Sequence, residues 1–187
     1  MASSYNQLFE VFKANLKKSY PAQKQLRRLG LGLNIGVGYN AQGWQHSKSH
    51  PLQHCLLFPL RRQNDKIVGF YGYPIKQPEA IKPGHRTNEV YFPKRTGFYP
   101  RYPNLYTERL LLTDHILNAA RLWQIHKVWE NYTVLACYSF HGLRQEQQQA
   151  IASLKALREV IFFFQTEATS ETLAGMPATG VPATQKV

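Results

Sequence analysis

The sequence predicts an α/β protein with a parallel sheet in its second half. Three short apolar runs, which begin at Leu110, Tyr132 and Val160, alternate with two segments of helical periodicity, and this alternation is typical of βαβ units. The third run is expected to lie inside the sheet with at least one fully buried phenylalanine. Ligands of such sheets bind where strands end and helices begin, so Asp114 and the residues after Phe164 form the first candidate site.

Length and composition limit the class of protein. A chain of 187 residues that is 43% hydrophobic has enough apolar material for one sizeable core or two small units. Its net charge of +12, from 23 Lys and Arg against 11 Asp and Glu, favours a polyanionic partner, either nucleic acid or an anionic membrane surface. No apolar run approaches the ~20 residues of a membrane span and no signal-peptide pattern is present, so a soluble, cytoplasmic protein is expected.

Two helices are predicted at the start of the chain. Ser4 is a suitable N-cap for an amphipathic helix, and Pro21 can begin a second short helix that continues through Leu29. The glycine-rich segment 30–39 that follows lacks the spacing of a nucleotide-binding fingerprint. A bent strand with close backbone packing is therefore expected there.

A β-hairpin is predicted next. Residues 55–60 and 67–73 are apolar runs, and Asn64-Asp65 supplies turn-forming residues between them. Cys55 in the first of these runs and Cys137 in a later one are expected to be buried free thiols and not a disulfide, because both lie inside apolar strand-like runs. Two isolated cysteines also cannot form a zinc ribbon.

Aromatic and basic residues alternate between residues 88 and 103. Cations for phosphates and flat rings for bases are the components of a groove for single-stranded nucleic acid. An alternative is that the tyrosines only cover the core under an irregular loop, and both interpretations stay open. With two arginines of the hairpin turn, the candidate nucleic-acid-binding residues are Arg61, Arg62, Lys94, Arg95, Tyr99, Arg101 and Tyr102.

Composition changes after residue 165. Residues 166–187 are rich in Thr, Ala, Gly and Pro and have little apolar bulk, which predicts a disordered or loosely held tail. The expected organisation is an N-terminal helical and strand-rich part over residues 1–105, a βαβαβ part over residues 106–165, and this tail.

Six segments in a fixed order carry a family resemblance. They are residues 35–39, residues 57–61 together with 67–72, and residues 97–103, 110–120, 134–143 and 161–164. In this order they resemble the catalytic core of bacterial primases, and more closely the short Toprim-domain proteins of Bacteroidetes-type mobile elements. The resemblance implies a primase-core-like N-terminal part and an incomplete Toprim-like parallel sheet, without counterparts of the zinc-binding domain and of the end of the Toprim domain.

The resemblance also implies a divalent-metal site, and this chain departs from it. The family has a glutamate at the end of the first Toprim strand, then a glycine and an aspartate, where this chain has Asp114, His115 and Asn118. The family's Asp-x-Asp pair corresponds to Gln165 and Glu167. Because phosphoryl transfer with two metals needs several carboxylate oxygens, the site is expected to be degenerate.

Asp114 and Glu167 are the remaining candidates for catalysis and for binding Mg²⁺. Asp114 also has a simpler interpretation as the N-cap of the helix that follows it, with Thr113 beside it. In the first half, Arg61 matches a basic position along the family's nucleic-acid path, and Tyr73 stands where a second arginine is usual.

The function expected first is that of a degenerate primase-like protein that binds single-stranded DNA or RNA during replication of a mobile element. The element's replication helicase is a candidate partner, and no membrane partner is expected. The alternatives are an active, divergent Mg-dependent primase or nucleotidyl transferase that uses Asp114 and Glu167, and a truncated product without activity.

Overall fold

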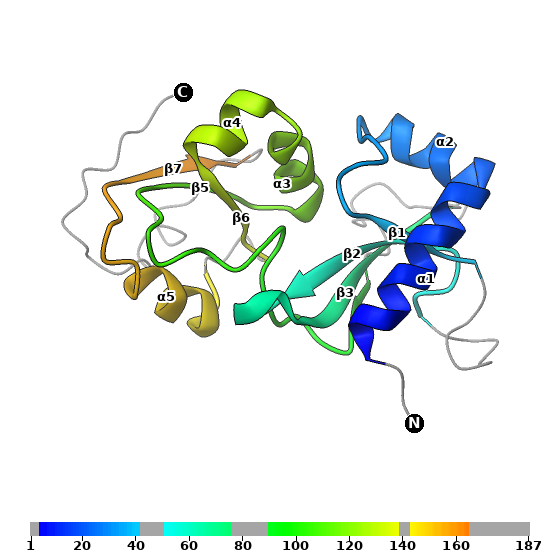
Figure 1. Cartoon of the computed structure of the whole chain (residues 1–187), viewed down its shortest axis with the longest axis horizontal. Helices are drawn as coiled ribbons and strands as arrows, with labels where there is room; N and C mark the ends of the chain where they lie inside the picture. Colours follow the sequence, from blue (N-terminus) through cyan, green and yellow to red (C-terminus); the bar gives the residue numbers. More distant parts are fainter. Residues whose placement is uncertain (1–3, 42–50, 76–89, 139–142, 165–187) are drawn as a thin grey trace, which may run out of the picture. The chain divides into compact units, whose positions relative to one another are not determined.

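The computed structural model describes residues 4–41, 51–75, 90–138 and 143–164. The chain divides into two compact units (Figure 1). The first comprises residues 1–60 and 66–95, and the second comprises residues 61–65 and 96–187. In this division the second unit resumes at residue 96, and the predicted boundary after residue 105 stays a prediction. The predicted tail lies outside the described residues.

Both predicted N-terminal helices are present in the first unit. Helix α1 (Tyr5–Lys18) begins with a capping box, in which Ser4 Oγ accepts from the Gln7 backbone N–H at 3.3 Å and Gln7 Oε1 accepts from the Ser4 N–H at 3.0 Å. Helix α2 (Tyr20–Arg28) has Pro21 in its first turn, where the missing N–H costs no helical hydrogen bond.

The first unit contains a four-stranded sheet in the order β1-β2-β3-β4. Its strands are β1 (Gly38–Asn40), β2 (Cys55–Arg61), β3 (Ile67–Pro74) and β4 (Val90–Phe92). The predicted hairpin is confirmed, with a 3-10 turn at Gln63–Asp65 between β2 and β3. Asn64 and Asp65 have φ values of 66° and 60°, a left-handed conformation that these two residue types tolerate well.

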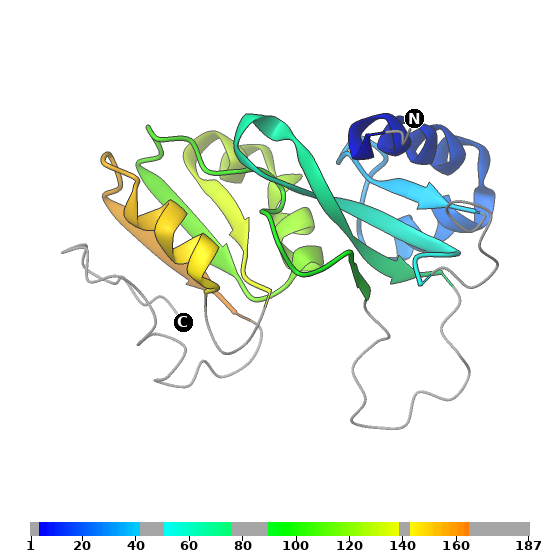
Figure 2. The same cartoon turned by 90° about the horizontal axis from the view of Figure 1, so that it is seen from below.

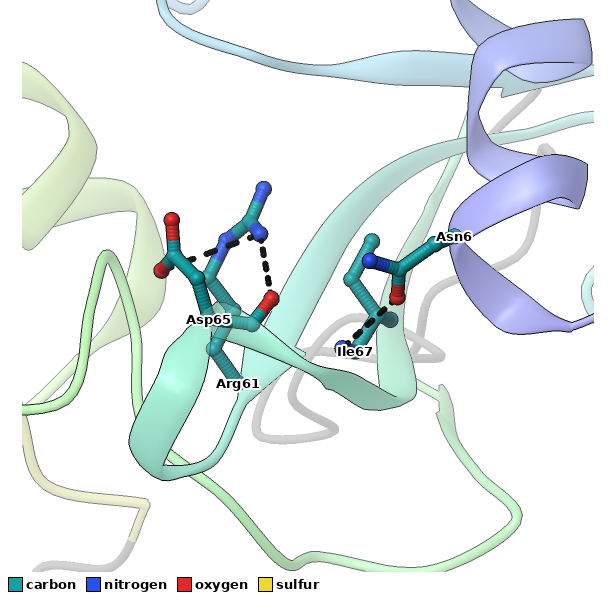
Figure 3. Close-up of polar contacts among 4 residues, drawn as sticks. All are labelled: Asn6, Arg61, Asp65 and Ile67. Carbon is teal, nitrogen blue, oxygen red and sulfur yellow. Dashed lines mark hydrogen bonds and ion pairs between the residues drawn. The ribbon is translucent and has the colours of Figure 1, made fainter.

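Helix α1 covers this sheet through aromatic side chains. Phe9 and Phe12 lie in one apolar cluster with Phe70 of β3. The predicted close backbone approach occurs at Gly38, where a Cβ atom would lie 2.6 Å from Phe12 Cβ, although the strand there is only three residues long. At the start of the helix, the Asn6 side chain accepts a hydrogen bond from the backbone N–H of Ile67 at 3.0 Å (Figure 3).

The second unit contains the predicted parallel sheet. Strand β5 (Arg109–Thr113) lies at the centre, with β6 (Thr133–Ala136) on one side and β7 (Glu159–Phe163) on the other. Figures 1 and 2 show α3 (Ile116–Trp123) and α4 (His126–Asn131) on one face of the sheet, and α5 (Gln145–Ala152) on the other. The βαβαβ order is confirmed, and α4 is an additional short helix that the periodicity did not predict.

In the part of the chain that the structure describes, strand β7 lies at the edge of the sheet and not inside it, which corrects the expectation for the third apolar run. Among the described residues it pairs with β5 alone. Phe162 and Phe164 are partly buried against the core beside Leu110 and Leu112, whereas Phe163 is 47% exposed. The sequence could not show this, because an edge strand and a central strand can have equally apolar runs.

Two other expectations concern the cysteines and the absence of membrane-spanning segments. Cys55 and Cys137 are buried free cysteines, as predicted. No helix in the described ranges is long and apolar enough to cross a membrane.

Candidate nucleic-acid interface and metal position

Asp114 follows the last residue of β5 and belongs to a buried polar network. Its Oδ1 accepts hydrogen bonds from Asn118 Nδ2 at 3.1 Å and from Thr113 Oγ1 at 3.3 Å. The side-chain Oδ1 of Asn118 in turn accepts from Arg121 Nη1 at 3.4 Å. The carboxylate is thus joined to one face of α3, because residues four apart on a helix lie above one another.

The N-cap of α3 is His115 and not Asp114. His115 Nδ1 accepts a hydrogen bond from the backbone N–H of Leu117 at 3.1 Å, which satisfies a donor at the start of the helix. The interpretation of Asp114 as the cap is therefore wrong. Its side chain turns to Asn118, one helical turn further along.

The described residues around Asp114 do not fit a divalent cation. One carboxylate is present in the network, and the amide of Asn118 directs its N–H group, a donor, at that carboxylate. Within the described ranges, no group of three or more His, Cys, Asp or Glu residues is arranged to hold a metal. Gln165 and Glu167, the other candidate positions, lie outside those ranges.

Cys137 lies near Asp114, directly after β6. Its backbone N–H donates to the Thr113 carbonyl at 2.7 Å. Burial, together with the smaller effect of the negative charge of Asp114, raises the pKa of the Cys137 thiol to about 12. The thiol therefore stays protonated at neutral pH and is neither a nucleophile nor a soft metal ligand there.

Two of the candidate nucleic-acid-binding residues, Arg101 and Tyr102, line a groove of about 370 Å³ in the second unit. The guanidinium carbon of Arg101 lies 5.3 Å from the centre of the Trp123 ring. The Tyr102 ring meets Phe98 edge to face at 4.6 Å, which holds it in place while part of it stays exposed. The other lining residues are Gln63, Asn64, Asp65, Pro103, Asn104 and Leu105.

Arg61 and Arg62 flank the hairpin turn and differ in how available they are. Arg61 Nη1 donates to the Asp65 carbonyl at 2.9 Å and lies 3.8 Å from Asp65 Oδ1 (Figure 3), and its side chain is 20% exposed. Arg62 is 57% exposed, and its Nε lies 3.5 Å from Glu146 Oε1. The Arg61 side chain therefore stabilises the turn, whereas Arg62 would lose a weak surface ion pair on binding a phosphate.

Lys94 and Arg95 belong to the first unit and are both exposed. The guanidinium carbon of Arg95 lies 4.7 Å from the centre of the Tyr91 ring, which is a cation–π contact. The structure therefore brings Arg61, Arg62, Arg101 and Tyr102 into one unit and leaves these two cations in the other.

Tyr99 cannot stack on a base in this structure, which corrects its proposed role. It is 1% exposed, and its carbonyl oxygen accepts from the Ala136 N–H of β6 at 3.0 Å. Burial raises the pKa of its hydroxyl well above the usual value. For Tyr99 the alternative interpretation, that the tyrosines cover the core, is correct, because its ring is part of the core.

Sequence reasoning missed two contacts at this site. Arg121 lies three residues after Asn118 on α3, and this helical spacing could have predicted the contact between them. Glu146 lies beside Arg62 and also accepts from the Gly97 backbone N–H at 3.2 Å. No sequence pattern predicts a contact between residues so far apart along the chain.

Solved structures share this architecture. A DnaG primase catalytic domain bound to single-stranded DNA matches with a TM-score of 0.61 and 14% identity, over 84% of this chain and 60% of that one. The chain has a primase-core-like fold. The RNA polymerase domain of Mycobacterium tuberculosis primase DnaG, in complex with double-stranded DNA, matches with a TM-score of 0.60 and 13% identity over 87% of this chain and 63% of that one.

The Aquifex aeolicus primase, in a structure of its zinc-binding and RNA polymerase domains, matches this chain with a TM-score of 0.60 and 11% identity. That match covers 85% of this chain and 46% of the other. No protein-family model and no curated protein matches. The chain thus spans about 60% of the first of these primase domains, and the likeness concerns the fold.

Proposed function

We propose that this chain is a primase-like protein that binds single-stranded DNA or RNA and has a degenerate metal site. Its fold resembles that of a primase catalytic domain bound to single-stranded DNA. A net charge of +12 favours a polyanionic ligand. A role in DNA replication of a mobile element, with that element's helicase as a partner, rests on the sequence resemblance.

The groove beside Arg101 and Tyr102 carries this proposal. A guanidinium held over an aromatic ring keeps its charge and its N–H donors available for phosphate, and the exposed part of the adjacent tyrosine offers a surface for a base. Amide side chains of Gln63, Asn64 and Asn104 line the same groove, and amides can hydrogen-bond to base edges.

The surroundings of Asp114 support the absence of metal catalysis. A carboxylate oxygen that already accepts from Asn118 and Thr113 has less capacity left for a cation, and the neighbouring position holds an amide in place of a second carboxylate. Catalysis by two metals needs several carboxylate oxygens in one place.

Binding is tested by fluorescence anisotropy of the whole chain with a labelled single-stranded oligonucleotide. Arg101→Gln and Tyr102→Ala should each weaken binding, the latter by ~1–3 kcal/mol if a base stacks on the ring. Lys127→Gln is the matched control, because it removes one positive charge from an exposed site on α4 of the same unit. An equal loss of affinity in the Lys127 and Arg101 variants would contradict a specific groove.

Catalysis is tested by primer synthesis on a single-stranded template with Mg²⁺ or Mn²⁺. We expect no product above the background of a control without protein. Primer that forms with the natural sequence and disappears in Asp114→Ala would contradict the degenerate site and favour the divergent, active primase.

A further inference from the structure

A second groove of the second unit lies at the other end of the parallel sheet. Arg109 and Thr133, which begin β5 and β6, line it, whereas Asp114 follows the last residue of β5. Its volume is about 400 Å³, within the range of ligand pockets. The other lining residues are Tyr106, Thr107, Glu108, Trp129, Glu130, Asn131 and Tyr132. It is therefore separate from the position of Asp114.

Three aromatic rings line this groove. Tyr106 is 84% exposed and Trp129 is 50% exposed, although burying such rings is normally favourable. Tyr132 is half-buried. Tyr and Trp are enriched among the residues that contribute most to protein–protein binding, so a cluster of exposed rings favours a partner.

The charge of the groove differs from that of the chain. Its lining includes two carboxylates, Glu108 and Glu130, and one cation, Arg109, in a protein whose net charge is +12. Arg109 is also paired with a carboxylate that does not line the groove, since its Nε lies 3.2 Å from Glu159 Oε2. The lining is thus net negative and disfavours a phosphate backbone.

Glu108 and Glu130 each contact an exposed side chain that an incoming cation can displace. Glu108 Oε2 lies 3.8 Å from Arg158 Nη1, and Glu130 Oε2 lies 2.9 Å from His126 Nδ1. Exposed contacts of this kind stabilise proteins only weakly, and the contact with His126 is an ion pair only when the imidazole is protonated. Exchanging one of them for a pair with an incoming cation therefore costs little.

The groove already holds a cation against an aromatic ring. The guanidinium carbon of Arg109 lies 5.8 Å from the centre of the Tyr132 ring. Aromatic faces with carboxylates nearby are the general means by which proteins bind ammonium and guanidinium groups. We propose that this groove binds an arginine or lysine side chain of a partner protein segment, seated between Tyr106 and Trp129 with its charge towards Glu130.

The test is an NMR titration of the whole ¹⁵N-labelled chain with two short Gly/Ser peptides, one containing two arginines and the other two glutamines. The indole N–H signal of Trp129, assigned by its loss in Trp129→Phe, should shift and saturate with the arginine peptide and not with the glutamine peptide. A lysine peptide shows which cation is preferred.

Variants locate the binding. Tyr106→Ala and Glu130→Gln should each weaken the arginine peptide about two- to five-fold, the size of an exposed cation–π or charge contact. Tyr20→Ala, which removes an exposed tyrosine from the first unit, should leave the affinity unchanged. Thermal melting of each variant verifies that it is folded.

Three results would overturn the proposal. The first is a shift of the Trp129 indole signal with the glutamine peptide that equals the shift with the arginine peptide. The second is unchanged affinity for the arginine peptide in both groove variants. The third is loss of oligonucleotide binding in Tyr106→Ala, which would make the groove part of the nucleic-acid surface. Failure of oligonucleotide binding in the natural chain would instead contradict the proposed function and leave this inference standing.

Discussion

Single residues at the end of β5 form a buried polar network around Asp114, the position that the sequence resemblance assigns to a metal ligand. Asp114 accepts from two neighbouring side chains, and Arg121 lies against the outer side of Asn118. The guanidinium brings a fixed positive charge to the network, as a bound cation would. Nearby Cys137 is buried, and its thiol stays protonated.

Alkaline pH should weaken the fold through the buried thiols. Burial raises the pKa of Cys55 and of Cys137 from 9.0 to about 12, so below pH 9 both are protonated whether the chain is folded or unfolded. Above pH 9 the unfolded chain loses these protons first. The free energy of unfolding should therefore fall between about pH 9 and 12, by ~1.4 kcal/mol per pH unit for each thiol.

Urea unfolding at several pH values between about 8 and 10 measures this slope. Cys137→Ala should reduce the slope by the share of one thiol, and Cys55→Ala by a similar share. A slope that both replacements leave unchanged would show that other groups cause the alkaline loss.

At the scale of elements, the edge position of β7 decides what its phenylalanines contribute. Side chains of a strand alternate between its two faces. Phe162 and Phe164 pack against the core of the second unit, with their ring centres 5.9 Å apart, whereas Phe163 lies on the opposite face of the strand and is 47% exposed. Neighbouring residues of one type therefore have different energetic roles.

Phe162→Ala should destabilise the fold more than Phe163→Ala. A fully buried phenylalanine typically contributes ~3–5 kcal/mol, and partly buried Phe162 should contribute roughly half of that. Phe163→Ala should change the free energy of unfolding by less than ~1 kcal/mol, as is usual for surface positions. Urea unfolding of both variants gives the comparison. Equal losses would indicate that another segment or molecule covers β7 in solution.

At the scale of the whole molecule, positive charge is distributed over both units. Lys94 and Arg95 belong to the first unit, and Arg62 and Arg101 belong to the second. Acidic groups lie among these cations, at Asp65 in the groove of Arg101 and at Glu146 beside Arg62, and also at Glu108 and Glu130 in the lining of the second groove. The proposed nucleic-acid ligand therefore interacts with cations of both units only if its backbone reaches both.

Oligonucleotide affinity should fall steeply with salt. Each neutralised phosphate of a single strand contributes a log–log slope of roughly −0.7, so four contacts give about −3. Arg62→Gln with Arg101→Gln should flatten the slope by about 1.4, the share of two phosphates. Anisotropy at three salt concentrations measures it.

The matched control for this slope is Lys127→Gln with Lys155→Gln, which removes the same charge from exposed sites of the same unit. A control that flattens the slope as much as the arginine pair would mean that net charge alone drives binding. Absence of binding at low salt would contradict the nucleic-acid hypothesis itself.

Local patterns in the sequence determined the elements of this protein. Ser4 and Gln7 form a capping box because the groups that satisfy each other are three residues apart. Asn64 and Asp65 form the hairpin turn because they tolerate positive φ. The apolar runs of β5, β6 and β7 alternate with helices and form the parallel sheet, since short connections through helices leave few other arrangements.

Tertiary structure alone decided which residues of the candidate site are accessible. Tyr99 and Tyr102 lie in one aromatic segment, yet the first is buried against β6 and the second lines a groove. Asp114 turns to Asn118 and leaves the cap to His115. The burial of Tyr99 depends on packing against β6, which comes from elsewhere in the chain, and neither residue type nor spacing encodes such a contact. The contacts of Asp114 and His115 are local, and the backbone geometry at the start of α3 decides which of the two side chains caps the helix.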